Sequence, residues 1–378
     1  MIPYSHQFID KQDIKAVKET LKSDWLTQGP KIKEFENALA DYCGARYAVA
    51  ISNGTAALQA AYFAAGIGPG DEIITSPITF AATTNAAIWQ GAKSVFVDIE
   101  KSTGNLDANL IEEKITDKTK AIVAVDYSGL PCDYGALKKI AKKYKLLLIN
   151  DAAHSLGAEY KNKKIGSLAD LTILSFHPVK SITTGEGGAV LTDNEDFYKK
   201  LFLFRGHGII KDSKNFRNES PGPWYYEMQE LGLNYRITDF QAALGTSQLK
   251  KLPEFMSLRR KIAKFYSKKL SGIKNLTLSS EFADRKSSQH LYPIRLLGKL
   301  QSRRREVFEK LQKAGIGVQV HYIPVYWHPY YQKLGYKKGL CPVAEDFYLS
   351  EISIPIYPSL KVANQRTIIR ELKNILDN

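Results

Sequence analysis

A lysine beside an apolar segment is the first residue whose setting suggests chemistry. Lys180 lies between the apolar segment 171–175 and the glycine-rich segment 185–188. Removal from water lowers the pKa of a lysine, and the uncharged amine is the nucleophile that attacks a carbonyl group. Most lysines in loops are simply solvated, so the interpretation of Lys180 depends on which other residues reach the same place.

An aspartate follows a second apolar segment. Asp151 comes directly after residues 146–150, and His154 comes three residues later. A carboxylate in so apolar a setting needs a cationic or hydrogen-bond-donating partner, which the protonated ring nitrogen of a pyridine-type cofactor would supply. A helix cap is an equally good interpretation, because Asp is a favoured N-cap residue.

The segment Asn53-Gly54-Thr55 lies between an expected strand and an expected helix. Small residues let backbone N–H groups approach an anion, and the Thr55 hydroxyl and the helix dipole favour phosphate. Neither a GxGxxG nor a P-loop pattern is present, so an ordinary tight turn is the commoner interpretation of this segment alone. A further motif at 231–239 precedes a helix for which Thr238 or Asp239 is the expected N-cap.

Between residues 32 and 200, short apolar segments alternate with segments of helical period. The expected strands are 47–51, 72–75, 94–97, 121–125, 146–149, 171–175 and 189–191, and the expected helices are 32–42, 56–65, 80–90, 107–113 and 134–144. This alternation predicts an α/β fold with a mostly parallel central sheet and helices on both faces. Ligands bind at the carboxyl ends of the strands in such sheets, and Asp151 and Ser175 are expected there.

After Asp239 the pattern changes. We expect a long helix over 241–270 that is interrupted near Pro253, strands at 291–296 and 317–322, and helices at 303–314 and 364–376. The chain is therefore expected to form two domains. The larger covers residues 1–250, and a smaller C-terminal α+β domain covers residues 251–378.

The composition is that of a folded globular protein: 378 residues, 44% of them hydrophobic and 24% charged, which excludes a disordered or fibrous chain. We see no apolar stretch long enough to span a membrane and no signal-peptide pattern. Three cysteines are too few and too scattered for a disulfide framework or a zinc site. A cytoplasmic protein with no metal and no membrane association is expected.

The net charge is +14, and nearly all of the excess arises after residue 200, with basic residues concentrated in 251–310. Nucleic acid, an acidic partner, an anionic substrate and a solvated lysine-rich surface are all compatible with this distribution. The chain shows no helix-turn-helix or zinc-module pattern, so a nucleic-acid partner is not expected. A diphosphate-linked substrate would use a minor part of the charge.

Taken together, these motifs and their order resemble the fold-type-I pyridoxal-phosphate enzymes and, more narrowly, the DegT/StrS family of nucleotide-sugar aminotransferases. The stretches that carry the resemblance are Trp25–Pro30, Asn53–Leu58, Gly68–Glu72, Asp151–Gly157, Ser175–Lys180, Gly185–Gly188 and Leu233–Arg236. The resemblance implies pyridoxal 5′-phosphate as the cofactor, with the protonated ring nitrogen acting as an electron sink. Lys180 favours transamination, because relatives that remove oxygen from the sugar carry His at this position.

The resemblance also implies which residues contact the cofactor. Lys180 would bond to it covalently, Asp151 would pair with its ring nitrogen, and His154 would lie beside its O3′ oxygen; these three are the expected catalytic residues. The remaining expected contacts are Phe80, stacked on the ring, and Gly54, Thr55, Ser175 and Asn234, which hold the phosphate. The family delivers the last of these from the neighbouring subunit, which implies a homodimer with shared active sites.

Within the family, the segments 4–6, 290–294, 318–326 and 344–348 are most similar to aminotransferases of pseudaminic acid biosynthesis. This implies transfer of nitrogen from L-glutamate to the C4 keto group of a UDP-4-keto-6-deoxy-N-acetylhexosamine. The implied substrate-binding residues are Tyr4, Asp24, Trp25, Leu26, Thr27, His321, Tyr322 and Tyr326. Asn53-Gly54-Thr55 departs from the Ser-Ala-Thr version typical of these enzymes, so another nucleotide-linked 4-keto sugar, of legionaminic or perosamine type, is the alternative.

Overall fold

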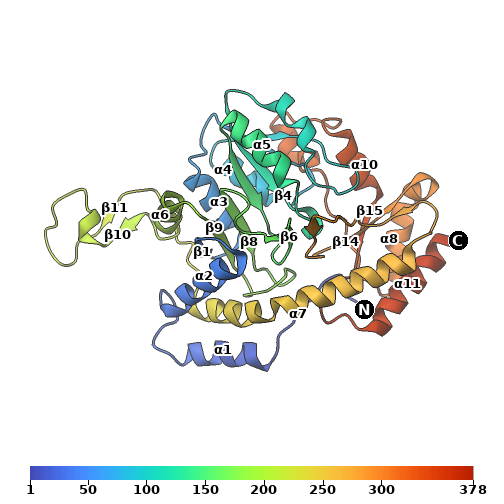
Figure 1. The fold of residues 1–378 in the computed structure, drawn as a ribbon, viewed down its shortest axis with the longest axis horizontal. Helices are drawn as coiled ribbons and strands as arrows, with labels where there is room; N and C mark the ends of the chain where they lie inside the picture. Colours follow the sequence, from blue (N-terminus) through green and yellow to red (C-terminus); the bar gives the residue numbers. More distant parts are fainter. Residues whose placement is uncertain (378) are drawn as a thin grey trace.

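The centre of the computed structural model, which describes residues 1–377, is a seven-stranded sheet (Figure 1). Its strands are β1 (Tyr47–Ile51), β2 (Glu72–Thr75), β3 (Lys93–Phe96), β4 (Thr119–Val125), β5 (Leu147–Asp151), β8 (Leu171–Ser175) and β9 (Gly188–Thr192). They lie in the order β1-β9-β8-β5-β4-β2-β3. β9 is antiparallel to both of its neighbours, while the other neighbouring pairs are parallel. The predicted mostly parallel sheet is confirmed.

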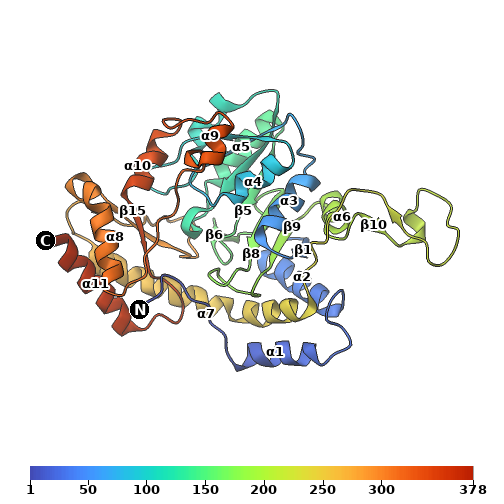
Figure 2. The same ribbon diagram turned by 180° about the vertical axis from the view of Figure 1, so that it is seen from behind.

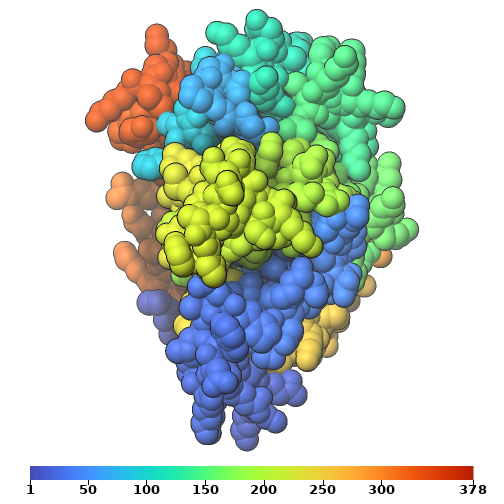
Figure 3. Space-filling view, turned by 90° about the vertical axis from the view of Figure 1, so that its left-hand side faces the viewer, coloured from blue at the N-terminus to red at the C-terminus, as the bar shows by residue number. Residues whose placement is uncertain are grey.

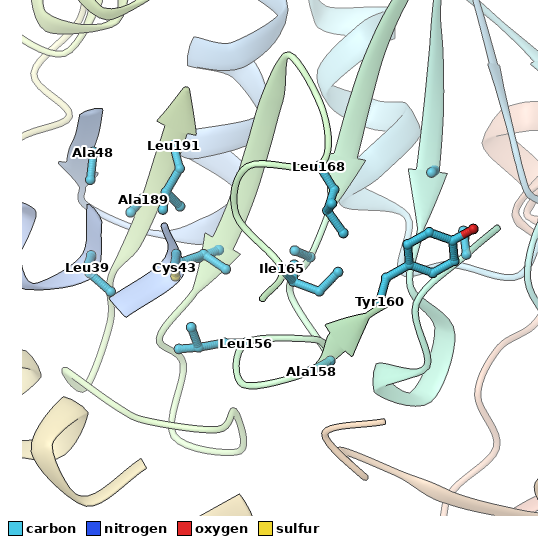
Figure 4. Packing of buried hydrophobic residues seen from close by; sticks show 14 of the residues in the cluster. Leu39, Cys43, Ala48, Leu156, Ala158, Tyr160, Ile165, Leu168, Ala189 and Leu191 are labelled. Atoms are coloured by element: carbon cyan, nitrogen blue, oxygen red, sulfur yellow. The ribbon is translucent and has the colours of Figure 1, made fainter. Parts of the chain in front are cut away.

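Helices cover both faces of this sheet. They are α2 (Pro30–Cys43), α3 (Gly54–Ala64), α4 (Ala82–Trp89), α5 (Tyr134–Tyr144), α6 (Glu195–Phe204) and α7 (Asp239–Leu270). α1 (Lys11–Leu21) packs against α7 on the side away from the sheet (Figure 1). Alternate residues of each strand enter two separate hydrophobic clusters: in β1, Ala48 joins the cluster with α2, α5 and α7, and Val49 joins the one with α3, α4 and α6. Figure 4 shows the first of these clusters, with Leu39 and Cys43 of α2 packed near Ala189 and Leu191 of β9. Burial on both faces explains why these strands are almost wholly apolar.

The C-terminal region forms its own hydrophobic cluster around a second, antiparallel sheet. The sheet contains β12 (Leu276–Thr277), β14 (Tyr292–Leu296) and β15 (Glu351–Ile354), and it packs with α8 (Arg304–Lys313), α11 (Val362–Asp377) and the end of α7. Two short helices, α9 (Pro329–Lys333) and α10 (Pro342–Ser350), lie between α8 and β15 in the chain. The expected domain division at residue 250 stays a prediction, because α7 runs unbroken across that position.

A small three-stranded sheet and a two-stranded ribbon complete the fold. β13 (Arg285–Lys286) pairs with β6 (Glu159–Tyr160), which also pairs with β7 (Lys163–Lys164). β10 (Ile209–Ile210) and β11 (Glu227–Met228) form a ribbon that projects from the molecule on the side away from α11 (Figures 1 and 2). Figure 3 looks onto that end, where the ribbon, in yellow-green, covers the centre of the face above the blue N-terminal helices. We call residues 206–232 the arm.

Three local expectations are wrong. α7 continues through Pro253, because buried Leu249, Leu252 and Phe255 hold the helix on both sides of the one hydrogen bond that proline removes. Residues 317–322 form no strand; one bridge between Gln319 and Ser353 replaces it. Residues 107–113 form two 3₁₀ turns, Ala108–Leu110 and Glu112–Lys114, in place of a helix.

The expected N-cap of α7 is confirmed. Thr238 accepts a hydrogen bond from the backbone N–H of Gln241, and the Gln241 side chain accepts one from the backbone N–H of Thr238. Within residues 1–377, no helix is long and apolar enough to cross a membrane.

Candidate active site

A cavity of about 970 Å³ opens at the carboxyl ends of the central strands. It is lined by residues from the ends of β5 and β8, the start of α3, the N-terminal segment and the loop at 321–322. The residues from the sequence prediction that line it are Tyr4, Gly54, Thr55, Phe80, Asp151, His154, Ser175, Lys180, His321 and Tyr322. The fold therefore brings together residues that lie more than 300 positions apart.

Asp151 is the last residue of β5 and is buried at the floor of this cavity. Its carboxylate accepts a hydrogen bond from the Thr83 hydroxyl at 2.6 Å and one from the backbone N–H of Ala153 at 3.2 Å. Burial raises its pKa, while these hydrogen bonds and the positive charge of Lys180 act in the opposite direction. Asp151 caps no helix, so the helix-cap interpretation is wrong, and its role as a functional charge stays a prediction.

Lys180 lies in the loop between β8 and β9 and faces the same cavity. Within the described chain, its amine has no hydrogen-bond or ion-pair partner. Burial lowers the pKa of Lys180 to about 8, and Asp151 opposes this shift. An amine with this pKa is uncharged in about a tenth of the molecules at pH 7, far more than an ordinary lysine, and the uncharged form is the one that attacks a carbonyl.

His154 is buried beside these two residues. Its Nε2 atom is 3.1 Å from the Tyr322 hydroxyl, and its ring packs against that of His290 with the centroids 4.3 Å apart. Burial, together with the positive charge of Lys180, lowers the pKa of His154 well below its usual value. Its Nδ1 atom is buried with no partner among the described residues. A neutral imidazole thus reaches the cavity with one nitrogen unsatisfied.

The start of α3 forms the opposite end of the cavity. Asn53 caps this helix by accepting a hydrogen bond from the backbone N–H of Ala56 at 2.8 Å. A Cβ atom on Gly54 would lie 3.0 Å from the Ser175 Cβ, so the start of α3 lies very close to the end of β8. Backbone N–H groups at a helix start, next to the hydroxyls of Thr55 and Ser175, form a place suited to a phosphate.

The C-terminal region supplies the far rim. His321 and Tyr322 line the cavity, and the Tyr4 ring lies 5.9 Å from the His321 ring. Phe80, which is 65% exposed, lies 6.3 Å from the Tyr322 ring. We call Tyr4, His321 and Tyr322 the rim.

Other expected site residues do not line this cavity. Asp24, Trp25, Leu26 and Thr27 are exposed on the segment between α1 and α2, where Thr27 bridges to Thr238. Asn234 is exposed and forms a bridge to Gly206 at the base of the arm, although its neighbours Leu233 and Tyr235 do line the cavity. Their expected contacts stay predictions.

Tyr326 is also away from the cavity. It is fully buried, and its hydroxyl donates a hydrogen bond to Glu345 at 2.7 Å. Its ring packs 5.3 Å from that of Phe96. Within this chain its surroundings are those of a core residue.

Sequence reasoning missed three residues of the site. Thr83 bonds to Asp151, His290 packs on His154, and Ser353 lies 2.8 Å from the Nδ1 atom of His321. Thr83 lies inside an alanine-rich helix with no local signal. The other two lie in the C-terminal region, where side-chain contacts depend on how the second sheet is placed against the first.

The cavity fits pyridoxal 5′-phosphate. Lys180 offers an unpaired amine for the aldehyde carbon, and Asp151 offers a buried carboxylate for a protonated ring nitrogen. The close approach at Gly54 leaves a helix start and hydroxyls for the phosphate, and the unsatisfied Nδ1 atom of His154 marks a polar position. Within residues 1–377, no cluster of His, Cys, Asp and Glu could hold a metal ion.

Comparisons with known proteins agree with this geometry. The sequence profile of the DegT/DnrJ/EryC1/StrS aminotransferase family matches residues 7–373. The chain is 44% identical over 382 residues to a UDP-4-amino-4,6-dideoxy-N-acetyl-beta-L-altrosamine transaminase of Campylobacter jejuni, covering 100% of this chain and 98% of the relative.

Two solved structures are similar along the whole chain. One is PseC of Helicobacter pylori, an aminotransferase involved in the biosynthesis of pseudoaminic acid, with a TM-score of 0.93 and 37% identity over 100% of this chain and 99% of that one. The other is a putative sugar aminotransferase of Streptococcus pneumoniae in its PLP-form, with a TM-score of 0.93 and 32% identity over 100% of this chain and 98% of that one.

Proposed function

Because the chain belongs to the DegT/DnrJ/EryC1/StrS aminotransferase family, we propose that it transfers nitrogen from L-glutamate to the C4 keto carbon of a UDP-4-keto-6-deoxy-N-acetylhexosamine. The chain is a pyridoxal 5′-phosphate-dependent aminotransferase. The reaction belongs to pseudaminic acid biosynthesis, the process in which PseC of Helicobacter pylori is involved. The observation that carries the proposal is the unpaired Lys180 amine in one cavity with buried Asp151.

Several residues would hold the cofactor. Asp151 would accept a hydrogen bond from the ring nitrogen, and Phe80 would lie against the ring. Gly54, Thr55 and Ser175 would bind the phosphate at the start of α3, and His154 would lie beside the O3′ oxygen. When bound, the cofactor serves as an electron sink that stabilises negative charge on the substrate carbon.

The protein's own part in the reaction is mainly proton transfer. The Lys180 amine removes the α proton of glutamate and later delivers a proton to C4 of the sugar, so it acts as both general base and general acid. Asp151 stays ionised when its cationic partner is bound, because the pairing offsets the cost of burying the carboxylate. The rim residues orient the sugar, and the enclosed floor of the cavity limits the access of water to the reacting carbon.

We also propose a homodimer in which Asn234 contacts the phosphate bound to the partner subunit. The arm supports this proposal, because it exposes large apolar side chains: Trp224 is 75% exposed and Leu231 is 78% exposed. Exposed apolar groups of this size mark surfaces that bind another protein. Asn234 lies at the base of the arm, next to residues that line the cavity of its own chain.

A reducing, cytoplasmic location is part of the proposal. Cys43, Cys132 and Cys341 are all free and buried. Unpaired thiols persist in compartments that keep cysteine reduced.

Product analysis tests the substrate. The cofactor-loaded enzyme is incubated with L-glutamate and, in separate reactions, with the UDP-4-keto-6-deoxy-N-acetylhexosamines of altro and gluco type and with GDP-4-keto-6-deoxymannose. We expect a 4-amino product, identified by NMR, from the first sugar in preference to the others. Preference for the GDP sugar, or for the gluco-type sugar that represents the legionaminic alternative, contradicts the proposed substrate. Failure to consume glutamate with any of the three sugars contradicts the proposed donor.

A further inference from the structure

A chain of hydrogen bonds leads from the rim into the core of the C-terminal region. His321 lines the cavity, and its Nδ1 atom is 2.8 Å from the Ser353 hydroxyl. That hydroxyl is in turn hydrogen-bonded to one carboxyl oxygen of Glu351. The other carboxyl oxygen accepts a hydrogen bond from the backbone N–H of His321 at 2.7 Å. Glu351 and Ser353 are fully buried in β15, so water does not complete these bonds.

This series of hydrogen bonds can be arranged in two ways, depending on whether Glu351 carries a proton. When it is ionised, the Ser353 hydroxyl donates to the carboxylate and accepts from Nδ1–H of His321, so Nε2 of His321 has a lone pair. When it is protonated, the carboxylic acid donates to Ser353 Oγ and the serine hydroxyl donates to Nδ1. His321 then carries its proton on Nε2, since each hydroxyl has one proton to donate.

We propose that Glu351, acting through Ser353, selects the tautomer of His321 and so decides whether this histidine accepts or donates a hydrogen bond toward the sugar. Nε2 of His321 has no hydrogen-bond partner among the described residues, and the ring lines the cavity. Glu351 and Ser353 are therefore positioning residues. The sugar group that they select would be a carbonyl or ether oxygen with protonated Glu351 and a hydroxyl or amide N–H with the ionised form.

The surroundings of Glu351 allow it to titrate within the pH range in which the enzyme can be assayed. Burial raises its pKa to about 8, while the hydrogen bonds with Ser353 and with the backbone N–H of His321 and the charge of Arg304 act in the opposite direction. Arg295 is its cross-strand neighbour in β14, and the hydroxyl groups of Tyr127 and Tyr322 also face it.

His321 itself stays neutral, so the exchange involves tautomers and not charge. Burial and the positive charge of Lys180 lower its pKa to about 3. The other titratable groups near its ring are Tyr4, Tyr322, His154 and His290. A neutral imidazole always has one protonated nitrogen, and the hydrogen bond at Nδ1 decides which nitrogen it is.

The test is ¹⁵N NMR of the cofactor-loaded full chain with labelled histidine, read between about pH 6 and pH 10 to bracket the raised pKa of Glu351. The signals of His321 are assigned by their loss in H321Q. We expect the proton to move from Nε2 to Nδ1 as the pH rises. In Glu351→Gln the amide donates to Ser353 permanently, so we expect the Nε2–H tautomer at every pH.

Ser353→Ala removes the hydroxyl that links Glu351 to His321 and should leave the His321 tautomer independent of pH. Ser353→Thr keeps a hydroxyl and should keep the pH-dependent change of tautomer. Ser350→Ala is the matched control, because Ser350 is equally buried but bonds only to carbonyl groups of α10. A parent enzyme whose His321 keeps one tautomer throughout, or a Glu351→Gln variant that exchanges like the parent, overturns the proposal. Thermal denaturation first confirms that each variant is folded.

The kinetic consequence rests on the proposed function. In the parent the KM for the sugar nucleotide should change about fivefold to tenfold across the transition, the worth of one hydrogen bond, while Glu351→Gln should show a flat profile. The NMR measurement needs no turnover. Failure of the tautomer proposal is therefore distinguishable from failure of the proposed substrate.

Discussion

The floor and the rim of the cavity differ in how they are built. Asp151 and Ser175 end strands of the central sheet, so the pleat and the flanking clusters hold them. Tyr4, His321 and Tyr322 lie on irregular segments. Isolated bridges hold these segments, such as Ile2 to Ile316 and Gln319 to Ser353, and hydrogen bonds with side chains of other elements hold His321. The strand ends thus belong to a rigid element, whereas the rim, which we propose contacts the sugar, lies on segments that can change without disturbing the central sheet.

The largest effect should come from a change to Lys180. Lys180→Ala removes the amine that moves protons, and we expect turnover to fall by about 10⁴-fold or more. Borohydride reduction followed by mass spectrometry should find the cofactor attached to the parent chain and not to the variant. Lys163→Ala, on the exposed strand β7, is the control and should keep full activity. Substantial turnover in Lys180→Ala would refute the assignment of this residue.

The proposed sharing of active sites between subunits should give the next largest effect. Lys180→Ala and Asn234→Ala homodimers should each be weak, and mixing them under conditions of subunit exchange should restore up to about a quarter of the parent activity, because a mixed dimer has one intact site. Activity assays before and after exchange measure this. No recovery, with exchange verified by a size-tagged subunit, contradicts the delivery of Asn234 across the interface.

Asp151→Asn should lower kcat by about 10²- to 10³-fold with a small change in KM, since it removes charge stabilisation that matters most at the transition state. Thr83→Val should reproduce only a small part of this loss, since it removes one of the two hydrogen bonds to that carboxylate. Steady-state kinetics separates the two parameters. An equal loss in both variants would mean that Thr83 does more than hold Asp151.

The rim should respond differently. His321→Gln should raise the KM for the sugar nucleotide by about tenfold and leave the glutamate half-reaction almost unchanged, because one hydrogen bond to the sugar is removed. Single-turnover spectroscopy follows each half-reaction separately. An equal slowing of both half-reactions would mean that His321 takes part in the chemistry common to both and does not act only in binding the sugar.

The smallest effect concerns stability in acid. The pKa of His321 is lowered to about 3 from its usual 6.5, so below pH 6.5 the unfolded chain takes up a proton that the folded chain does not. Stability therefore falls with decreasing pH, by up to about 1.4 kcal/mol per pH unit for this residue. His321→Gln should have a shallower acid dependence in denaturant titrations than His328→Gln, a partly exposed control. Equal slopes would contradict the burial of a neutral His321.

Much of the floor could be predicted because its signals are local. Asp151 and Ser175 each follow a run of apolar residues, and a parallel sheet brings the ends of such runs to one edge. The assignment of Lys180 needed the joint pattern, since a lysine in a loop has no signal of its own. Thr83 could not be found in this way, because its contact with Asp151 depends on how α4 packs on β5.

The sequence by itself determined the seven strands of the central sheet, four of the five helices expected between residues 32 and 200, and the family, because each depends on periodicity or on short motifs. Only the tertiary structure decided that α7 passes through Pro253, that residues 317–322 stay irregular, and that Tyr326 is buried away from the cavity. Only the fold joins Glu351 and Ser353 to His321 and places Tyr4 beside it. These contacts join residues far apart in the chain, and their energy arises from packing and burial that no local pattern encodes.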